Sequence, residues 1–143
     1  MTATLHDPAL ESLALFGLHP RDTQEGIRYL LDGLPAEGWD RLLERLGVGE
    51  RRLAWVVRIP PTTLHRRKQS GRFTPEESER LWRLARLVTH AAQVFRTPEG
   101  VARWFSRPNR ALGGATPLEY ARTPLGAEEV ERVLERILDG GPA

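Results

Sequence analysis

The sequence predicts an all-α protein in which two small helical units share one long central helix. Apolar residues recur at helical spacing along most of the chain, and no segment alternates apolar and polar residues for long enough to predict a sheet. Proline and glycine fall where such helices would begin and end, which is typical of helix boundaries. The length of 143 residues suits one compact domain or two helical modules with a common core.

Composition and charge narrow the possible functions. The chain has no cysteine, which excludes disulfides, thiolate zinc sites and cysteine nucleophiles. No apolar run is long enough to span a bilayer, and the start MTATLHDP lacks the charged beginning of a signal peptide, so we expect a cytoplasmic protein. The net charge of +2 conceals a segregation, because residues 1–50 carry −5 and residues 51–72 carry +7. Since fields act over about 8–10 Å, the basic segment is more informative than the total.

Residues 1–20 are predicted to form an N-terminal arm or short helix. Asp7 can cap a helix over residues 8–16, which Gly17 would end. The leucines of this helix and Phe16 need a partner. An arm folded onto its own domain and a dimer contact both fit the pattern.

Two scaffold helices are predicted next. The first runs from about residue 22 to residue 32 and stops at Gly33, and the second opens at Pro35 and ends before Gly47. Their exposed faces are acidic, so phosphate would repel them and they should point away from a duplex. Apolar residues share one face in each helix: Ile27, Leu30 and Leu31 in the first, and Trp39, Leu42, Leu43 and Leu46 in the second.

Residues 49–72 are predicted to form a helix, a tight turn and a second helix with a basic outer face. Arg58 and Ile59 make the turn, and the second helix starts near Pro60 and Pro61, where a missing N–H does no harm. Residues 51–72 contain no acidic residue. Their basic residues are Arg51, Arg52, Arg58, Arg66, Arg67, Lys68 and Arg72.

This layout is that of a helix-turn-helix DNA reader, whose second helix lies in the major groove with its N-terminal residues at base edges. Arg66 can fork onto a guanine edge, whereas Arg67, Lys68 and Arg72 are better placed for phosphates. The alternative is a solvated basic face in an ordinary helical domain, which the short turn and the absence of acid make less favourable. The residues predicted to contact DNA are Arg58, Thr62, Thr63, His65, Arg66, Arg67, Lys68, Gln69 and Arg72.

The longest helix is predicted over residues 75–95, at about 33 Å. Thr74 and Glu77 form a capping box, with Pro75 at the first helical position. The apolar stripe of this helix is too broad to be covered from one side. We therefore interpret it as a spine shared by both halves, with a homodimer seam as a second use. After it, the sequence predicts a helix over residues 98–106, a break at 107–110, a short helix from the capping box at Thr116 to about Arg122, a turn at 123–126 and a last helix over 127–138.

The basic segment resembles the Xre-type helix-turn-helix, whose pattern is roughly LAxxLGISxxTLxRRxxxG. The corresponding residues here read LAWVVRIPPTTLHRRKQSG. The chain departs from the pattern at Arg58, where the family usually has glycine, and at Pro60, which replaces the usual serine cap. A left-handed arginine at that position would cost about 1 kcal/mol.

The C-terminal segment, residues 96–143, closely resembles the antitoxin Xre/MbcA/ParS toxin-binding domain. The match is specific because spaced prolines, glycines and aromatics agree at once, and the two resemblances together cover residues 25–143. They divide the chain into an arm (1–20), a helix-turn-helix domain with the long helix (21–95) and a toxin-binding domain (96–143). The matching residues are Ala102, Trp104, Pro108, Asn109, Ala111, Leu112, Gly113, Gly114, Pro117, Leu118, Thr123, Gly126, Val130, Leu134, Ile137 and Gly140.

The resemblance implies an antitoxin of the RES–Xre class. The partner of such proteins is a RES-domain toxin, related in fold to ADP-ribosyltransferases, that depletes NAD. The antitoxin obstructs the toxin's NAD pocket and represses its own operon, usually as a dimer. The acidic tail at residues 139–143 would then be the plug. The residues implied to contact the toxin are Arg103, Trp104, Pro108, Asn109, Arg110, Leu112, Gly113, Gly114, Asp139, Gly140 and Gly141.

Other interpretations stay open for these residues and for the whole chain. Trp104 can equally belong to the core, Gly113 and Gly114 can serve a turn with positive φ, and the tail can be a plain chain end. A rival function is a stand-alone transcriptional regulator whose C-terminal half dimerises or senses a ligand. An enzyme has little support, since the four histidines are scattered and no phosphate-cradling glycine loop occurs. We therefore expect no catalytic residue, no metal site and no cofactor.

Overall fold

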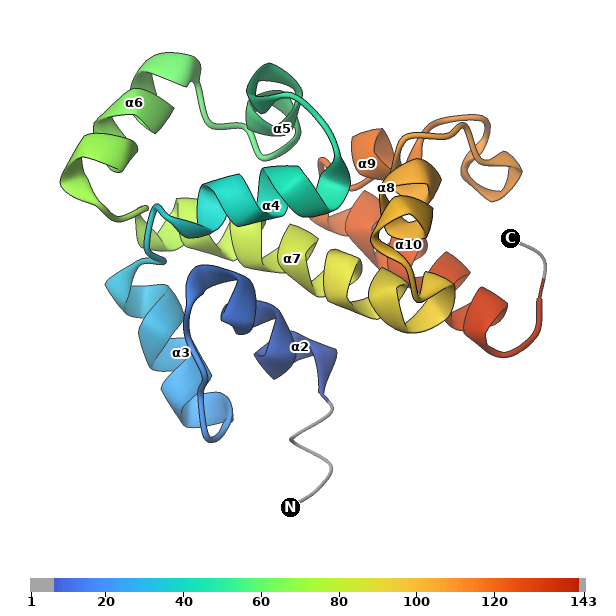
Figure 1. The fold of residues 1–143 in the computed structure, drawn as a ribbon, viewed down its shortest axis with the longest axis horizontal. Coiled ribbons are helices and arrows are strands. Elements are labelled where there is room, and N and C mark those ends of the chain that lie inside the picture. The colour runs from blue at the N-terminus through green and yellow to red at the C-terminus, as the bar shows by residue number, and fades with distance from the viewer. Residues whose placement is uncertain (1–6, 142–143) are drawn as a thin grey trace.

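Helix α7 (Pro75–Phe95) is the axis of the molecule, and elements from both ends of the sequence pack along it (Figure 1). The computed structural model describes residues 7–141, and all the regular elements within that range are helical, which confirms the predicted all-α class. The other elements are α2 (Pro8–Glu11), the 3₁₀ helix η1 (Ser12–Phe16), α3 (Thr23–Asp32), α4 (Gly38–Leu46), α5 (Glu50–Val56), α6 (Pro61–Ser70), α8 (Pro98–Phe105), the 3₁₀ helix η2 (Arg110–Leu112), α9 (Pro117–Tyr120) and α10 (Pro124–Leu138). None of the helices in the described range is both long and apolar enough to cross a membrane.

The boundaries of α7 agree with the prediction. Thr74 Oγ1 accepts a hydrogen bond from the Glu77 N–H at 3.2 Å, and the Glu77 carboxylate accepts one from the Thr74 N–H at 2.9 Å, so the capping box is complete. At its other end the helix stops at Arg96, which has a left-handed φ of 65°. The helix is 21 residues long and buries apolar side chains on several faces, so it serves both halves of the core.

Four Thr-Pro pairs begin helices, and one of them corrects the prediction. The hydroxyls of Thr74, Thr97, Thr116 and Thr123 each accept the N–H of the residue three positions later, with proline at the first helical position. Thr123 is therefore the N-cap of α10 and residues 124–126 are its first turn, so the separate turn predicted at residues 123–126 is wrong. Gly126 is needed for close packing, because a Cβ there would lie 1.8 Å from the Tyr120 carbonyl oxygen.

The start of α4 also differs from the prediction. Pro35 does not open the helix, because it forms an antiparallel bridge with Arg72. The Phe73 N–H donates to the Leu34 carbonyl at 3.0 Å, and the Leu34 N–H donates to Ser78 Oγ at 2.8 Å. These bonds hold the chain extended before α4, so the helix begins only at Gly38.

The N-terminal arm packs onto its own chain. It forms two short elements, α2 and η1, where a single helix over residues 8–16 was predicted, and Asp7 and Gly17 cap them at the expected places. Leu13 and Phe16 are buried, and the indole N–H of Trp82 donates to the Ala9 carbonyl at 2.8 Å. Of the two partners considered for the arm, its own domain is the one observed.

Helix α3 leaves part of its apolar face uncovered. Leu30 is half-buried, but Ile27 and Leu31 are 52% and 67% exposed. The buried residue of the helix is Gly26, whose small size lets Leu10 of the arm approach closely. The three apolar residues of the predicted face therefore do not all contribute to the core.

Candidate functional site

The basic segment folds as two helices joined by a tight left-handed turn. Arg58 has a φ of 57°, which allows the Ile59 N–H to donate to the Ala54 carbonyl at 3.0 Å. Ile59 and Leu64 are buried, so they anchor the turn and α6 to the core. The left-handed conformation explains why the related pattern has glycine at this position, and arginine there costs about 1 kcal/mol.

The outer face of α6 presents hydrogen-bonding side chains to solvent. Thr62, His65, Arg66 and Gln69 are exposed and Thr63 is half-buried, whereas Leu64 points inward. Arg66 touches only its own helix in the contacts observed, donating to Thr63 Oγ1 at 3.3 Å. The end of α6 nearest the turn therefore carries the donors and acceptors that a base-reading helix needs.

Two of the three cations predicted to contact phosphates are paired with acids of the chain itself. Arg67 donates to both oxygens of Glu77, at 2.7 and 3.1 Å, and Lys68 pairs with Glu50. The third, Arg72, donates to the Gly33 carbonyl at 2.9 Å. Arg67 is thus a structural link between α6 and α7, and its side chain is not free for a phosphate in this arrangement.

These pairs also set the protonation of their carboxylates. Burial alone would raise the pKa of Glu77, but the hydrogen bonds from Arg67 and from the Thr74 backbone outweigh it and lower the pKa. The hydrogen bond from Lys68 lowers the pKa of Glu50, and the indole N–H of Trp39, 2.9 Å away, acts in the same direction. Both carboxylates therefore stay ionised and hold their cations at neutral pH.

Other cations near the turn have no acidic partner in the described part of the chain. Arg51 and Arg58 are exposed and form no ion pair there. Arg80 of α7 donates to the Val57 carbonyl at 2.7 Å, which places a further arginine beside the turn. The unpaired positive charge therefore lies around the turn more than along α6.

In the C-terminal segment, three residues predicted to contact the toxin are buried. Trp104 lies between Phe95 and Phe105, with ring centroids 5.5 and 5.2 Å away, and it is 8% exposed. Leu112 and Asn109 are buried too, and the Asn109 side chain accepts from the Ala111 N–H. Their burial agrees with the alternative in which such residues belong to the core, and direct contact of these three side chains with a toxin stays a prediction.

The surface of the same segment is formed by a glycine turn and by exposed cations. Gly113 and Gly114 have φ values of 66° and 90°, and a Cβ at either would meet nothing within 4 Å, so the backbone conformation is what requires glycine. Pro108 and Arg110, which flank Asn109 beside this turn, are exposed, and Arg103 of α8 is exposed as well. Together with Asp139 and Gly140 at the end of α10, these five residues are the exposed part of the predicted toxin-binding set.

The tail begins as an ordered helix end. The Gly141 N–H donates to the Arg136 carbonyl at 2.7 Å and the Gly140 N–H to the Ile137 carbonyl at 3.0 Å, with Gly140 left-handed at φ 99°. This pair of bonds is a Schellman motif, a common way to end an α-helix. Asp139 and both glycines therefore belong to the end of α10, and residues 142–143 of the expected plug lie outside the described residues.

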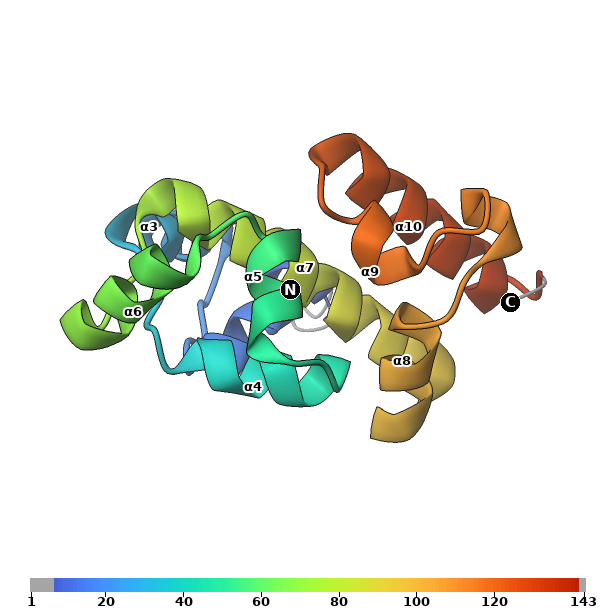
Figure 2. The same ribbon diagram turned by 90° about the horizontal axis from the view of Figure 1, so that it is seen from above.

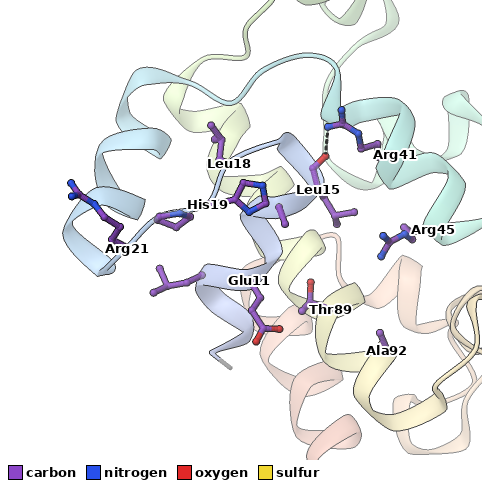
Figure 3. A pocket seen from close by; sticks show the side chains of 12 residues that line it. Glu11, Leu15, Leu18, His19, Arg21, Arg41, Arg45, Thr89 and Ala92 are labelled. Carbon is purple, nitrogen blue, oxygen red and sulfur yellow. Dashed lines mark hydrogen bonds between the residues drawn. The ribbon is translucent and has the colours of Figure 1, made fainter. Parts of the chain in front are cut away.

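A groove lies away from both predicted sites. It has a volume of about 630 Å³ and runs between the arm, α4 and α7 (Figure 3). Arg41 donates to the Leu15 carbonyl at 2.9 Å across its edge, and Arg45 and His19 line it as well. None of the residues predicted to contact DNA or toxin is among its lining residues.

One contact between the two halves could not be foreseen from spacing. Arg122, which follows α9, places its guanidinium 4.3 Å from the ring centroid of Trp55 and donates from Nε to the Trp55 carbonyl at 3.1 Å. Trp55 is 51% exposed on α5, an unusual place for a tryptophan with no external partner. In the sequence, the presence of a tryptophan within the basic segment was the feature that could have indicated such a contact.

Comparisons with known proteins identify both halves. The family described as "Antitoxin Xre-like helix-turn-helix domain" matches residues 25–86, and "Antitoxin Xre/MbcA/ParS C-terminal toxin-binding domain" matches residues 90–140. A protein named Antitoxin Xre from Photorhabdus laumondii is 32% identical over 113 residues, which cover 78% of this chain and 76% of that protein.

Two further relatives match different shares of this chain. The Antitoxin Xre of Yersinia enterocolitica is 40% identical over 84 residues, and the match spans 57% of each protein. A protein of Sphingobium sp. named Prs ADP-ribosylating antitoxin is 26% identical over 143 residues, which cover 93% of this chain and 88% of that one. The similarity thus extends over the helix-turn-helix, α7 and the C-terminal helices together.

Proposed function

The chain belongs to the Xre family of antitoxins, and from this premise we propose that it neutralises a cognate RES-domain toxin and represses its own operon in the cytoplasm. The observation that carries the proposal is the presence of both family domains on one chain, at residues 25–86 and 90–140. The toxin would be bound by the C-terminal helices and operator DNA by α6. The chain itself would supply binding only, and the chemistry would be the toxin's.

The proposed toxin-binding surface is the exposed set around the glycine turn. Arg103, Pro108 and Arg110 present side chains there, and Gly113 and Gly114 let backbone approach a partner closely. The end of α10, with Asp139 and the two glycines that follow, is a second candidate contact. A cationic and glycine-rich surface suits an acidic rim around an enzyme pocket.

Neutralisation is tested by co-expressing this chain with the product of the adjacent open reading frame. We expect a stable complex and preserved cellular NAD, compared with NAD loss when the neighbouring product is expressed alone. A Gly113→Asp and Arg110→Glu double variant should lose protection while keeping the helical content seen by circular dichroism. A chain that forms only an isolated dimer, with no effect on NAD, would instead support the stand-alone regulator.

A second toxin chemistry is favoured by the relative that covers most of this chain. The Sphingobium protein is named a Prs ADP-ribosylating antitoxin, so we propose transfer of ADP-ribose to a protein as the alternative activity of the partner. Both reactions break the bond between nicotinamide and ribose and release nicotinamide, and they differ in whether water or a protein side chain accepts the ADP-ribosyl group. Mass spectrometry of cellular proteins, run beside the NAD assay, distinguishes the two.

The DNA-binding part of the proposal includes a homodimer. Helix-turn-helix proteins commonly bind two half-sites about 34–36 Å apart, which requires two copies of the reading helix. The spine and the arm, first considered as dimer seams, are both occupied within the chain, because α7 is covered by elements on several sides and the arm packs onto it. Among the exposed apolar side chains, which also include Leu125 and Leu138 of α10, we propose Ile27 and Leu31 for this role because they lie one helical turn apart on α3.

A further inference from the structure

We propose that Arg122, together with Arg51 and Arg58, forms a binding site for a DNA backbone phosphate, so that the toxin-binding half contributes directly to the DNA interface. The site is a cavity of about 480 Å³ whose walls also include Trp55, Pro60 and Pro61. The inference rests on the proposed DNA-binding function. It extends that function to a residue beyond the helix-turn-helix.

The cavity lies where a DNA strand must pass if α6 enters the major groove. Pro60 is the N-cap of α6 and Pro61 is its first residue, and both form part of the cavity wall. A helix that points its N-terminal end at base edges has a phosphate backbone beside that end, because the groove is bounded by its two strands. Seen from above, α5 lies between α6 and α9, so the segment after α9 borders the same surface (Figure 2).

The charges of the cavity have no acidic partner, unlike those of Arg67 and Lys68 on α6, whereas Arg66 of the same helix is also without one in the described part of the chain. In the described part of the chain, no carboxylate lies within ion-pair distance of Arg51, Arg58 or Arg122. Arg67 and Lys68, by contrast, are already neutralised by Glu77 and Glu50. Because phosphate binding requires unneutralised cations, the cavity is the stronger attractor for DNA backbone.

Arg122 is held in an orientation that suits a phosphate. Its Nε–H is used by the Trp55 carbonyl and its plane lies over the Trp55 ring, which leaves the two terminal nitrogens to bind another acceptor. A guanidinium fixed by stacking loses less side-chain entropy on binding than a free one. The exposed position of Trp55 is thereby explained as a platform for this arginine.

The test is salt-dependent binding of the full chain to a fluorescent random-sequence duplex, measured by anisotropy in NaCl. Each phosphate contact contributes about 0.9 to the slope of log Kd against log salt. Because three arginines share the one phosphate, removing one of them can abolish at most this one contact. Between about 50 and about 200 mM NaCl, the affinity of the Arg122→Ala variant for the duplex should therefore fall by a factor up to about 3.5 smaller than that of the unmodified chain. Arg51→Ala should show the same change, and it leaves the contact between Arg122 and Trp55 intact.

The matched control is Arg107→Ala, which removes the same charge from an exposed position of the C-terminal half outside the cavity. Its slope should equal that of the unmodified chain. If Arg122→Ala and Arg51→Ala keep that slope too, the phosphate site is wrong although DNA binding stands. If the unmodified chain shows no salt-dependent binding to any duplex, the proposed DNA function and this site both fail.

Discussion

At the scale of single residues, Glu77 combines two structural roles. It completes the capping box of α7 and also accepts both hydrogen bonds from Arg67, which ties the reading helix to the spine. Hydrogen bonds to charged groups contribute about 1.5–3 kcal/mol. Glu77→Gln should therefore lower the free energy of unfolding by about that amount in urea denaturation at neutral pH. Glu76→Gln, an exposed neighbour in the same turn, serves as the control.

The same residue gives the chain a predictable response to acid. The pKa of Glu77 is lower in the folded state than its ordinary value of 4.5, so its contribution to stability is complete above that value. The contribution is lost as the pH falls through the lowered pKa, because the folded state must then take up a proton. Unfolding curves between about pH 5 and about pH 2 should show a shallower loss of stability in Glu77→Gln than in the unmodified chain. Equal slopes would mean that the carboxylate is not held by Arg67.

On the scale of elements, α6 has one arginine without an acidic partner, Arg66, and two cations that are already paired with carboxylates, Arg67 and Lys68. Arg66→Ala should weaken operator binding by about 1–3 kcal/mol and relax the preference at one base position. Lys68→Ala should change the salt slope by less than one unit, because Glu50 already neutralises that ammonium. Both effects are measured by anisotropy on a series of operator variants. A full unit of slope lost in Lys68→Ala would show that the pair opens when DNA binds.

The close approach of Gly126 in α10 to the Tyr120 carbonyl can be tested by substitution. Gly126→Ala would place a Cβ at 1.8 Å from the Tyr120 carbonyl oxygen, so α10 or α9 has to move. We expect a loss of about 1–3 kcal/mol in unfolding free energy, typical of overpacking. Gly49→Ala is the matched control, since a Cβ there meets nothing within 4 Å and the backbone φ of −77° is ordinary. If the two variants are equally stable, the close approach is not a constraint.

The order of the helices was predictable because local signals control it. Thr-Pro pairs and left-handed glycines set most helix ends, and the long helix was found over residues 75–95 with its capping box. The errors occur where distant residues decide. The start of α4 was predicted at Pro35, but Pro35 forms a bridge with the distant Arg72. A separate turn was predicted at residues 123–126, but Gly126 lies within a helix and is needed for its close approach to the Tyr120 carbonyl. Neither partner can be identified from spacing along the chain.

The candidate sites were less predictable for the same reason. Within residues 51–72 there is no acid, which made every cation appear free for DNA. Glu50 and Glu77 lie just outside that window and fold back onto it. Arg122 is 67 residues away from Trp55 in sequence, and no periodicity connects them. The resemblance to known domains supplied the function, whereas only the fold reveals which cations remain unpaired.

At the scale of the whole molecule, the proposed homodimer is tested at the exposed apolar residues of α3. If Ile27 and Leu31 form the dimer seam, Ile27→Glu combined with Leu31→Glu should convert the dimer to a monomer and weaken operator binding. Because both side chains are more than half exposed, the double variant should fold with nearly unchanged helical content. Sedimentation velocity at several concentrations measures the outcome. An unchanged dimer would move the seam to another surface.

Because α7 is uninterrupted, the binding of the two proposed partners, DNA and toxin, can be coupled along it. The helix has no glycine, and its one proline is in the first turn, so nothing along about 30 Å acts as a hinge. A rod of this kind cannot flex at one end without tilting at the other. If binding of one partner tilts this rod, it changes the affinity for the second partner by some factor, and thermodynamic reciprocity then demands the identical factor in reverse. Titrating each partner with and without the other would reveal how strongly the rod joins them.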